Sequence, residues 1–366
     1  MDLPWRFGFA GGVARLAAID HLVFPSGNAE LAFRESCRSA DRIFHLGDRA
    51  AVAGGGAYRF RIVAHFQQCE LDARDGGDRI HSMVRAGSWK SLLRRRTWLA
   101  EKLPAKITVL DVGAGAAVHV RASRADWLLD CGSGRDYERV LRPYLHGAGI
   151  NRITGLLLTH GDSLHLGGTE NLLRDFVPDV LIDNSATDRS TVHRRIREIF
   201  PTHRLNLLTL KAGENFPISS DVSGRILFPP ADFTAATADD QAFVVQLSIK
   251  RTKILFVSDS GYATEKSLLA SRSDLRSDVL VKGQHHSGNS GSDVFLDAVR
   301  PRLIVATSRD FPQQERISDE WAGQVRARNI KLFRQDETGV VELEFGEREW
   351  QARAYLTGEI FRSANR

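Results

Sequence analysis

The sequence predicts an α/β protein built as an αββα sandwich, in which two mixed sheets pack face to face and helices cover their outer sides. Three observations support this fold class. Strand-type runs occur in clusters, helical spacings are interspersed between them, and three strand ends lead into short loops that carry histidine or aspartate. Clustered strands with helices at wider intervals favour two sheets over a single doubly wound sheet.

Individual elements can be assigned from the hydrophobic pattern that begins after Pro104. Short apolar or β-branched runs bounded by turn residues predict strands at residues 107–110, 118–120, 127–129, 155–158, 180–182, 225–228, 243–249, 254–257, 279–281, 303–306 and 340–345. Apolar residues at helical spacing predict helices at residues 137–145, 168–176, 191–199, 293–299 and 318–328. Residues 105–366 are therefore predicted to form one domain. Residues 1–104 form an N-terminal extension whose weak periodicity defines no fold.

The extension also carries the positive charge of the chain. The formal net charge is +5, and the Lys and Arg surplus lies before the predicted domain, in which the two signs balance. The densest basic cluster contains Lys90, Arg94, Arg95 and Arg96. A basic patch of this kind can contact nucleic-acid phosphate. It is more often a solvated helix face, so the charge pattern by itself does not predict a nucleic-acid partner.

Neither a membrane span nor a secretory signal is predicted. No stretch reaches the ~18 consecutive apolar residues that a transmembrane helix needs, and the apolar cluster at residues 7–13 is too short for a signal peptide. Cys37, Cys69 and Cys131 show no paired spacing, so no disulfide framework or zinc knuckle is expected. These features favour a reducing, cytoplasmic location.

The most informative segment is the loop at residues 158–168. A buried-type strand leads into His160, Asp162 and His165, and glycines allow the backbone to turn tightly around them. Imidazole nitrogen and carboxylate oxygen are the ligands that a catalytic zinc or manganese ion prefers. Taken alone, this segment has a less favoured alternative, which is a loop with surface histidines.

Two further strand ends carry the same kinds of residue. Asp259 follows the strand at residues 254–257, and His285 and His286 follow the strand at residues 279–281. Loops at strand ends gather at one rim of an α/β fold and commonly hold functional residues. The three loops are therefore predicted to meet in one metal centre. Asp111 and Asp130 stand beside glycine loops and are expected to brace them.

The order and spacing of these segments resemble the metallo-β-lactamase fold, and most closely the C-terminal hydrolase domain of the ComEC competence proteins. The resemblance covers about residues 105–350. It is carried by an Asp-Val-Gly loop, an Asp-x-Gly loop, a Thr-His-x-Asp-x-x-His-x-Gly-Gly loop, a strand-end aspartate and a late His-His loop, which stand at residues 111–113, 130–132, 159–168, 258–259 and 283–287.

The resemblance implies a divalent metal centre with one or two Zn or Mn ions, whose ligands are His160, Asp162, His165, Asp259, His285 and His286. Asp259 would bridge two ions, only one of the two neighbouring histidines would be a ligand, and Asp162 and His286 would act in catalysis. The implied activity is a phosphodiesterase or nuclease related to DNA uptake. DNA is the implied partner, together with a separate membrane channel protein and association with a membrane, because this chain lacks the family's channel.

Several positions depart from the family pattern. Leu164 stands where the family has a metal-binding aspartate, and leucine offers no electron pair to a metal. Ala114 and Ala116 replace polar residues of the first glycine loop, and the family's Asn and Ser are replaced near Asp240 and Ala242. Two interpretations remain. The chain is either a hydrolase with a degenerate metal site or an inactive module of the same fold for nucleic-acid binding or assembly. A hydrolase for a small ester or lactam is a third.

Overall fold

The computed structural model describes residues 105–184, 190–203, 205–231, 233–235, 237–288, 290–309 and 316–363, together with five short strands in the first 72 residues. The chain divides into two compact units, Met1–Trp98 and Leu99–Arg366. In the first unit, β1 (Phe9–Ala10) pairs with β2 (Val13–Ala14), and β3 (His45–Leu46), β4 (Arg59–Ala64) and β5 (Gln67–Asp72) form a second sheet. The basic cluster predicted around Lys90 lies outside the described residues.

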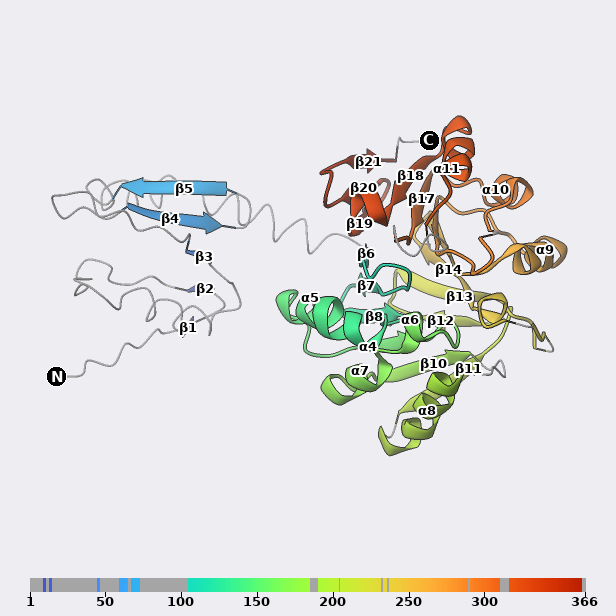
Figure 1. The fold of residues 1–366 in the computed structure, drawn as a ribbon. Coiled ribbons are helices and arrows are strands. Elements are labelled where there is room, and N and C mark those ends of the chain that lie inside the picture. Colours follow the sequence, from blue (N-terminus) through green and yellow to red (C-terminus); the bar gives the residue numbers. More distant parts are fainter. Residues whose placement is uncertain are drawn as a thin grey trace. The chain divides into compact units, whose positions relative to one another are not determined.

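The second unit contains a nine-stranded mixed sheet (Figure 1). Its order is β11-β10-β9-β8-β7-β6-β19-β20-β21. The strands are β6 (Ala105–Val109), β7 (Val118–Ala122), β8 (Ala125–Leu129), β9 (Gly155–Leu157), β10 (Val180–Asn184), β11 (Asn206–Leu210), β19 (Val341–Phe345), β20 (Trp350–Ala354) and β21 (Ile360–Arg362). Strands β8 to β11 run parallel to one another, and the remaining neighbours are antiparallel.

A seven-stranded mixed sheet packs against it, in the order β12-β13-β14-β15-β16-β17-β18. Its strands are β12 (Asn215–Pro217), β13 (Val222–Phe228), β14 (Val244–Ile249), β15 (Thr252–Ser258), β16 (Val279–Lys282), β17 (Leu303–Ala306) and β18 (Lys331–Arg334). The first four are antiparallel neighbours, whereas β15 to β18 run parallel. The three loops that carry the predicted metal ligands follow parallel strands of the two sheets.

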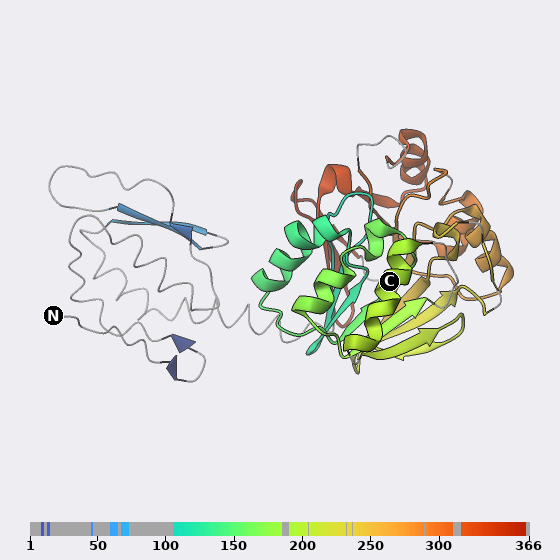
Figure 2. The ribbon, with the colours of Figure 1, turned by 60° about the horizontal axis from the view of Figure 1, so that its bottom comes forward.

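Helices cover the outer faces of both sheets (Figure 1). Those of the first half are α4 (Gly134–Asp136), η1 (Tyr137–Leu141), α5 (Arg142–Gly147), α6 (Ser163–Leu166), α7 (Thr169–Asp175), α8 (Thr191–Ile199) and η2 (Phe200–His203). Those of the second half are η3 (Asp239–Gln241), α9 (Tyr262–Ala270), α10 (Asp293–Val299), α11 (Asp319–Ala327) and α12 (Gln335–Thr338). In Figure 2 the green helices and the orange-to-red helices gather on different sides of the strands.

Three hydrophobic clusters separate these four layers. Successive side chains of a strand point to opposite faces of its sheet, so one strand contributes to two clusters. In β8, Trp127 and Leu129 belong to the cluster between the sheets, and Leu128 belongs to the cluster beneath the first-half helices. In β15, Phe256 faces the other sheet and Leu255 faces the second-half helices. The predicted αββα architecture is therefore confirmed. No helix in the described ranges has the length and apolar character that crossing a bilayer requires.

Local sequence signals account for most element boundaries. Serines cap three helices, because the hydroxyls of Ser190, Ser292 and Ser318 accept from backbone N–H groups in the first turns of α8, α10 and α11. The strands β11, β12, β18, β20 and β21, the helix α9 and the short helices α4, α6 and α12 were not predicted. Strand β11 is exposed along most of its length, so it lacks the buried alternation on which a strand prediction depends.

Candidate metal centre

The three loops that were predicted to bind metal lie together at the ends of strands from both sheets. His160 and Asp162 follow β9 of the nine-stranded sheet, whereas Asp259 follows β15 and His285 follows β16 of the seven-stranded sheet. Nε2 of His165 lies 2.9 Å from Oδ2 of Asp259 although the two residues are 94 positions apart. Parallel strands that end at one edge therefore bring these side chains together, as the sequence predicted.

The loop after β9 is shaped by a helix cap and by a glycine. Asp162 is the N-cap of α6, and its Oδ1 accepts from the backbone N–H of Leu164 at 2.6 Å. This cap directs His165, one turn later, back into the interior. Gly115 lies against the same turn, and a Cβ atom at that position would be 1.9 Å from the carbonyl oxygen of Leu164. The first glycine loop thus fixes the position of the ligand loop.

Asp130 anchors this loop from below. It is 1% exposed, and its Oδ1 accepts from the backbone N–H of Thr159 at 2.8 Å. Its Oδ2 accepts from Oγ1 of Thr159 at 2.6 Å and from Nδ1 of His165 at 2.8 Å. Since both oxygens are committed to the protein, Asp130 acts as a positioning residue, in the bracing role expected from the sequence.

The same network determines which nitrogen of His160 carries its proton. The single hydroxyl hydrogen of Thr159 is donated to Asp130, which as a carboxylate only accepts. Nδ1 of His160, 2.9 Å from that hydroxyl oxygen, must therefore be the donor. The opposite nitrogen, Nε2, is left with a lone pair. It is buried and has no hydrogen-bond partner among the described residues. Burial and the neighbouring His165 lower the pKa of His160, which keeps the ring neutral.

His165 is held differently, because both of its ring nitrogens contact carboxylates. Nδ1 lies 2.8 Å from Asp130 and Nε2 lies 2.9 Å from Asp259. Burial alone would lower the pKa of His165, but the field and hydrogen bonds of Asp259 and Asp130 outweigh burial and hold the pKa well above its usual value. Neither nitrogen has a free lone pair in this arrangement.

Asp239 and Asp240 are site residues that the sequence did not assign. They form the turn η3 just before β14, and Oδ1 of Asp239 lies 3.9 Å from Nε2 of His160. Oδ2 of Asp239 accepts from the backbone N–H and from Nδ1 of His286, at 3.1 and 2.8 Å. Burial would raise the pKa of Asp239, but these hydrogen bonds lower it overall. The sequence signal that could have identified them is a pair of consecutive aspartates just before a buried strand. The sequence departs from the family pattern at the same place.

The two histidines after β16 differ in exposure. Nδ1 of His285 lies 2.7 Å from Oγ of Ser287 and 3.2 Å from its backbone N–H, so Ser287 holds this edge of the ring. Nε2 of His285 is buried, 3.5 Å from Oδ1 of Asp240. The side chain of His286 is 55% exposed and faces solvent beyond its bond to Asp239. His286 is therefore the accessible member of the pair.

The end of β16 also contains a buried lysine. Lys282 is 2% exposed, its Nζ donates to the carbonyl oxygen of Gly283 at 2.7 Å, and it lies 4.8 Å from the centre of the Trp321 ring. Burial lowers the pKa of Lys282 to about 8. Gly283 is constrained as well, because a Cβ atom there would lie 1.7 Å from Oδ1 of Asp259. Lys282 thus braces this loop from the interior and is not a solvated strand end.

The donor atoms at this edge fit a divalent cation. In the part of the chain that the structure describes, three sets of side chains have ligand atoms within 4.8 Å of one another, namely Asp130 with His160 and His165, Asp239 with His285 and His286, and His160 with Asp162 and Asp239. A buried imidazole nitrogen with a lone pair and no partner, as in His160, is costly unless something binds it. The predicted ligand Asp259 belongs to none of these sets.

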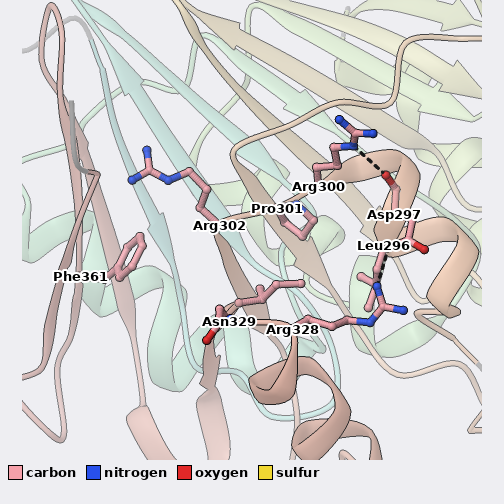
Figure 3. A pocket seen from close by; sticks show the side chains of 9 residues that line it. Leu296, Asp297, Arg300, Pro301, Arg302, Arg328, Asn329 and Phe361 are labelled. Atoms are coloured by element: carbon pink, nitrogen blue, oxygen red, sulfur yellow. Dashed lines mark hydrogen bonds and ion pairs between the residues drawn. The ribbon is translucent and has the colours of Figure 1, made fainter. Parts of the chain in front are cut away.

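A separate pocket of about 570 Å³ lies elsewhere in the second unit. It is lined by residues of α10 and the neighbouring loops, including Asp297, Arg300 and Arg328, with Phe361 on its opposite side (Figure 3). Arg328 forms an ion pair with Asp297 at 2.6 Å. None of the six predicted site residues lines this pocket, so it is not part of the candidate metal centre.

Comparison with known proteins agrees with this geometry. Residues 110–280 match the family model of the metallo-beta-lactamase superfamily. The chain carries a metallo-β-lactamase domain. Members of this superfamily are generally hydrolases, and the fold generally binds divalent metals such as zinc. The matched segment includes His160, Asp162, His165 and Asp259, and it ends before the His285–His286 loop.

The chain is also similar to curated competence proteins. It is 28% identical over 244 residues to the competence protein ComA of Neisseria gonorrhoeae, which covers 66% of this chain and 32% of that protein. It is 20% identical over 260 residues to ComE operon protein 3 of Bacillus subtilis, covering 66% and 33%. The chain therefore spans about a third of the length of these relatives. A solved structure, the metallo hydrolase Igni18 of Ignicoccus hospitalis, matches at 12% identity with a TM-score of 0.46, covering 66% of this chain and 99% of that one.

Proposed function

We propose that the metallo-β-lactamase domain is a metal-dependent phosphodiesterase that acts on nucleic acid. The observation that carries this proposal is Nε2 of His160, a buried nitrogen with a lone pair that has no protein partner and that has carboxylates nearby. A hydrogen-bond network through Thr159 and Asp130 holds this nitrogen in place. Such outer partners orient a histidine ligand and fix its tautomer in metal sites.

A bound Zn or Mn ion would lower the pKa of a water molecule toward neutrality and polarise the phosphoryl oxygen. The protein's own part is to place donors and move protons. Asp162 would hold the ion with one carboxylate oxygen, while the other accepts from the backbone N–H of Leu164 and caps α6. His286, exposed and fixed by Asp239, is the residue that would give a proton to the leaving oxygen. Both assignments follow the roles that the resemblance implies.

The substrate class is inferred from the relatives and from the chemistry of the site. The curated relatives are described as competence proteins, and a third, 26% identical over 220 residues, is described as recombination protein 2 of Haemophilus influenzae. We therefore propose DNA as the substrate. We also propose a separate membrane channel protein as its partner, with the domain at the membrane surface, because the relatives are described as competence proteins.

The test is a comparison of three substrates with the purified full chain in the presence of Mn²⁺ or Zn²⁺. Bis-p-nitrophenyl phosphate and single-stranded DNA should be hydrolysed, and hydrolysis should stop when EDTA removes the metal. A lactam should remain intact. Hydrolysis of the lactam but of neither phosphodiester would contradict the proposed substrate class, and would favour a small-ester or lactam hydrolase.

Leu164 supports the alternative of an inactive module, because it stands where the family has a ligand. We predict that Leu164→Asp raises the number of bound ions per chain, since a carboxylate at this turn adds a donor beside His165. Leu164→Asn is the matched control, equal in size but uncharged, and should leave metal content near that of the natural chain. The measurement is metal analysis after loading with Zn²⁺ and removal of the excess. A lower metal content in Leu164→Asp would show that the site is built around leucine.

A further inference from the structure

The carboxylate at the centre of the cation site is not the one that the family pattern designates. We propose that the cation is bound by His160, Asp162 and Asp239, and that Asp259 is not among its ligands, because Oδ2 of Asp259 is hydrogen-bonded to His165 and no set of clustered donor atoms in the described residues includes Asp259. This inference rests on the metal dependence proposed above, but not on the substrate. It assigns a ligand role to a turn, η3, that the family resemblance does not mark as a metal site.

The distances between donor atoms show which pairs of side chains leave space for an ion between them. Two ligands bound at ~2.0–2.2 Å to one tetrahedral ion lie roughly 3.4 Å apart. Nε2 of His165 and Oδ2 of Asp259 are 2.9 Å apart, which is a hydrogen bond and leaves no space for an ion between them. Nε2 of His160 and Oδ1 of Asp239 are 3.9 Å apart and share no hydrogen bond, so an ion can lie between them.

The protonation pattern selects the same set. His160 presents a lone pair at Nε2, because its Nδ1 donates to the hydroxyl of Thr159. In the competing set around Asp239, Nδ1 of His286 is already bonded to Asp239 at 2.8 Å, and the set contains one carboxylate. His160, Asp162 and Asp239 are therefore the set that combines a buried, unpartnered lone pair with two carboxylates within 4.8 Å.

Leu164 adds no donor on the His165 side of the site. Its side chain offers no electron pair to a metal, and its backbone N–H donates to Asp162 at 2.6 Å. Asp130 holds the opposite edge of His165 at 2.8 Å, so the imidazole is fixed between two carboxylates. On this side of the site one oxygen of each carboxylate is bonded to His165, whereas Oδ1 of Asp239 faces Nε2 of His160 without a hydrogen bond between them.

The test compares Asp239→Asn with Asp259→Asn in the full chain. Both changes preserve side-chain size and remove one charge, and Mn²⁺ is titrated into each protein by isothermal titration calorimetry. Asp239→Asn should weaken Mn²⁺ binding about hundredfold or more, because even outer partners of ligands contribute ten- to hundredfold. Asp259→Asn should weaken it by roughly fivefold or less, as expected for a nearby charge that is not a ligand. His165→Gln breaks the same pair and should likewise retain binding if Asp259→Asn fails to fold.

The outcomes separate this inference from the proposed function. Unchanged affinity in Asp239→Asn would overturn the inference, and so would a loss in Asp259→Asn or His165→Gln as large as that in Asp239→Asn. In each of those cases the natural chain still binds Mn²⁺, so the metal dependence would stand. If the natural chain binds no Mn²⁺, both the inference and the proposed function are overturned.

Discussion

Replacement of His160 by alanine is expected to abolish metal-dependent hydrolysis of bis-p-nitrophenyl phosphate. The variant removes the buried Nε2 that has no protein partner, and with it the ligand that the Thr159–Asp130 network holds in place. A metal ion contributes several kcal/mol to the stabilisation of developing charge, which corresponds to roughly a thousandfold in rate at about 1.4 kcal/mol per tenfold. The measurement is kcat/KM with saturating Mn²⁺.

His146→Ala is the matched control for this experiment. His146 is an exposed histidine of α5 whose ring packs 5.7 Å from that of Phe176, away from every predicted ligand loop. Its replacement should leave kcat/KM unchanged within about twofold. Hydrolysis by His160→Ala at the rate of the natural chain would remove the loop at residues 158–168 from the mechanism.

Asp130→Asn is expected to cause the largest loss of folding stability among single substitutions at the site. The carboxylate is buried and accepts three hydrogen bonds, from Thr159 N, Thr159 Oγ1 and His165 Nδ1. An amide retains one acceptor oxygen, so at least one buried donor is left without a partner and the charge opposite His165 is lost. Removing one partner of a buried pair costs about 3–5 kcal/mol. The measurement is the free energy of unfolding from urea denaturation.

Asp179→Asn provides the comparison at the surface. Asp179 pairs with Arg152 at 2.7 Å, but the two side chains are 38% and 76% exposed. Exposed pairs contribute ~0–1 kcal/mol, so this variant should unfold at nearly the same urea concentration as the natural chain. Equal stability losses in the two variants would show that Asp130 does not hold the ligand loop.

The fold could be predicted from the sequence because its signals are local. Strand and helix periodicities located α8, α10 and β17 to the residue. Several of the elements that were missed lack such signals. Strand β11 is mostly exposed, and β12 and β21 are only three residues long. Short edge strands are determined by pairing with a neighbour, which the hydrophobic pattern of one segment does not encode.

The candidate site could be predicted only in part. Histidines and aspartates at strand ends indicated the loops, and the structure brings those loops together at one edge. The contribution of Asp239 was not visible, because it arises from a turn that packs against His160 from 79 positions away. The direct contact between His165 and Asp259 was equally hidden, since a sequence motif specifies residue types and not whether two donors face an ion or each other.

The most direct test of the account is the anomalous scattering of Mn²⁺ in crystals of the full chain grown with the metal. We expect a peak ~2.0–2.2 Å from Nε2 of His160, with Asp239 and Asp162 in contact with it and Asp259 still bonded to His165. A peak between His165 and Asp259, or no peak beside His160 at saturating Mn²⁺, would contradict it.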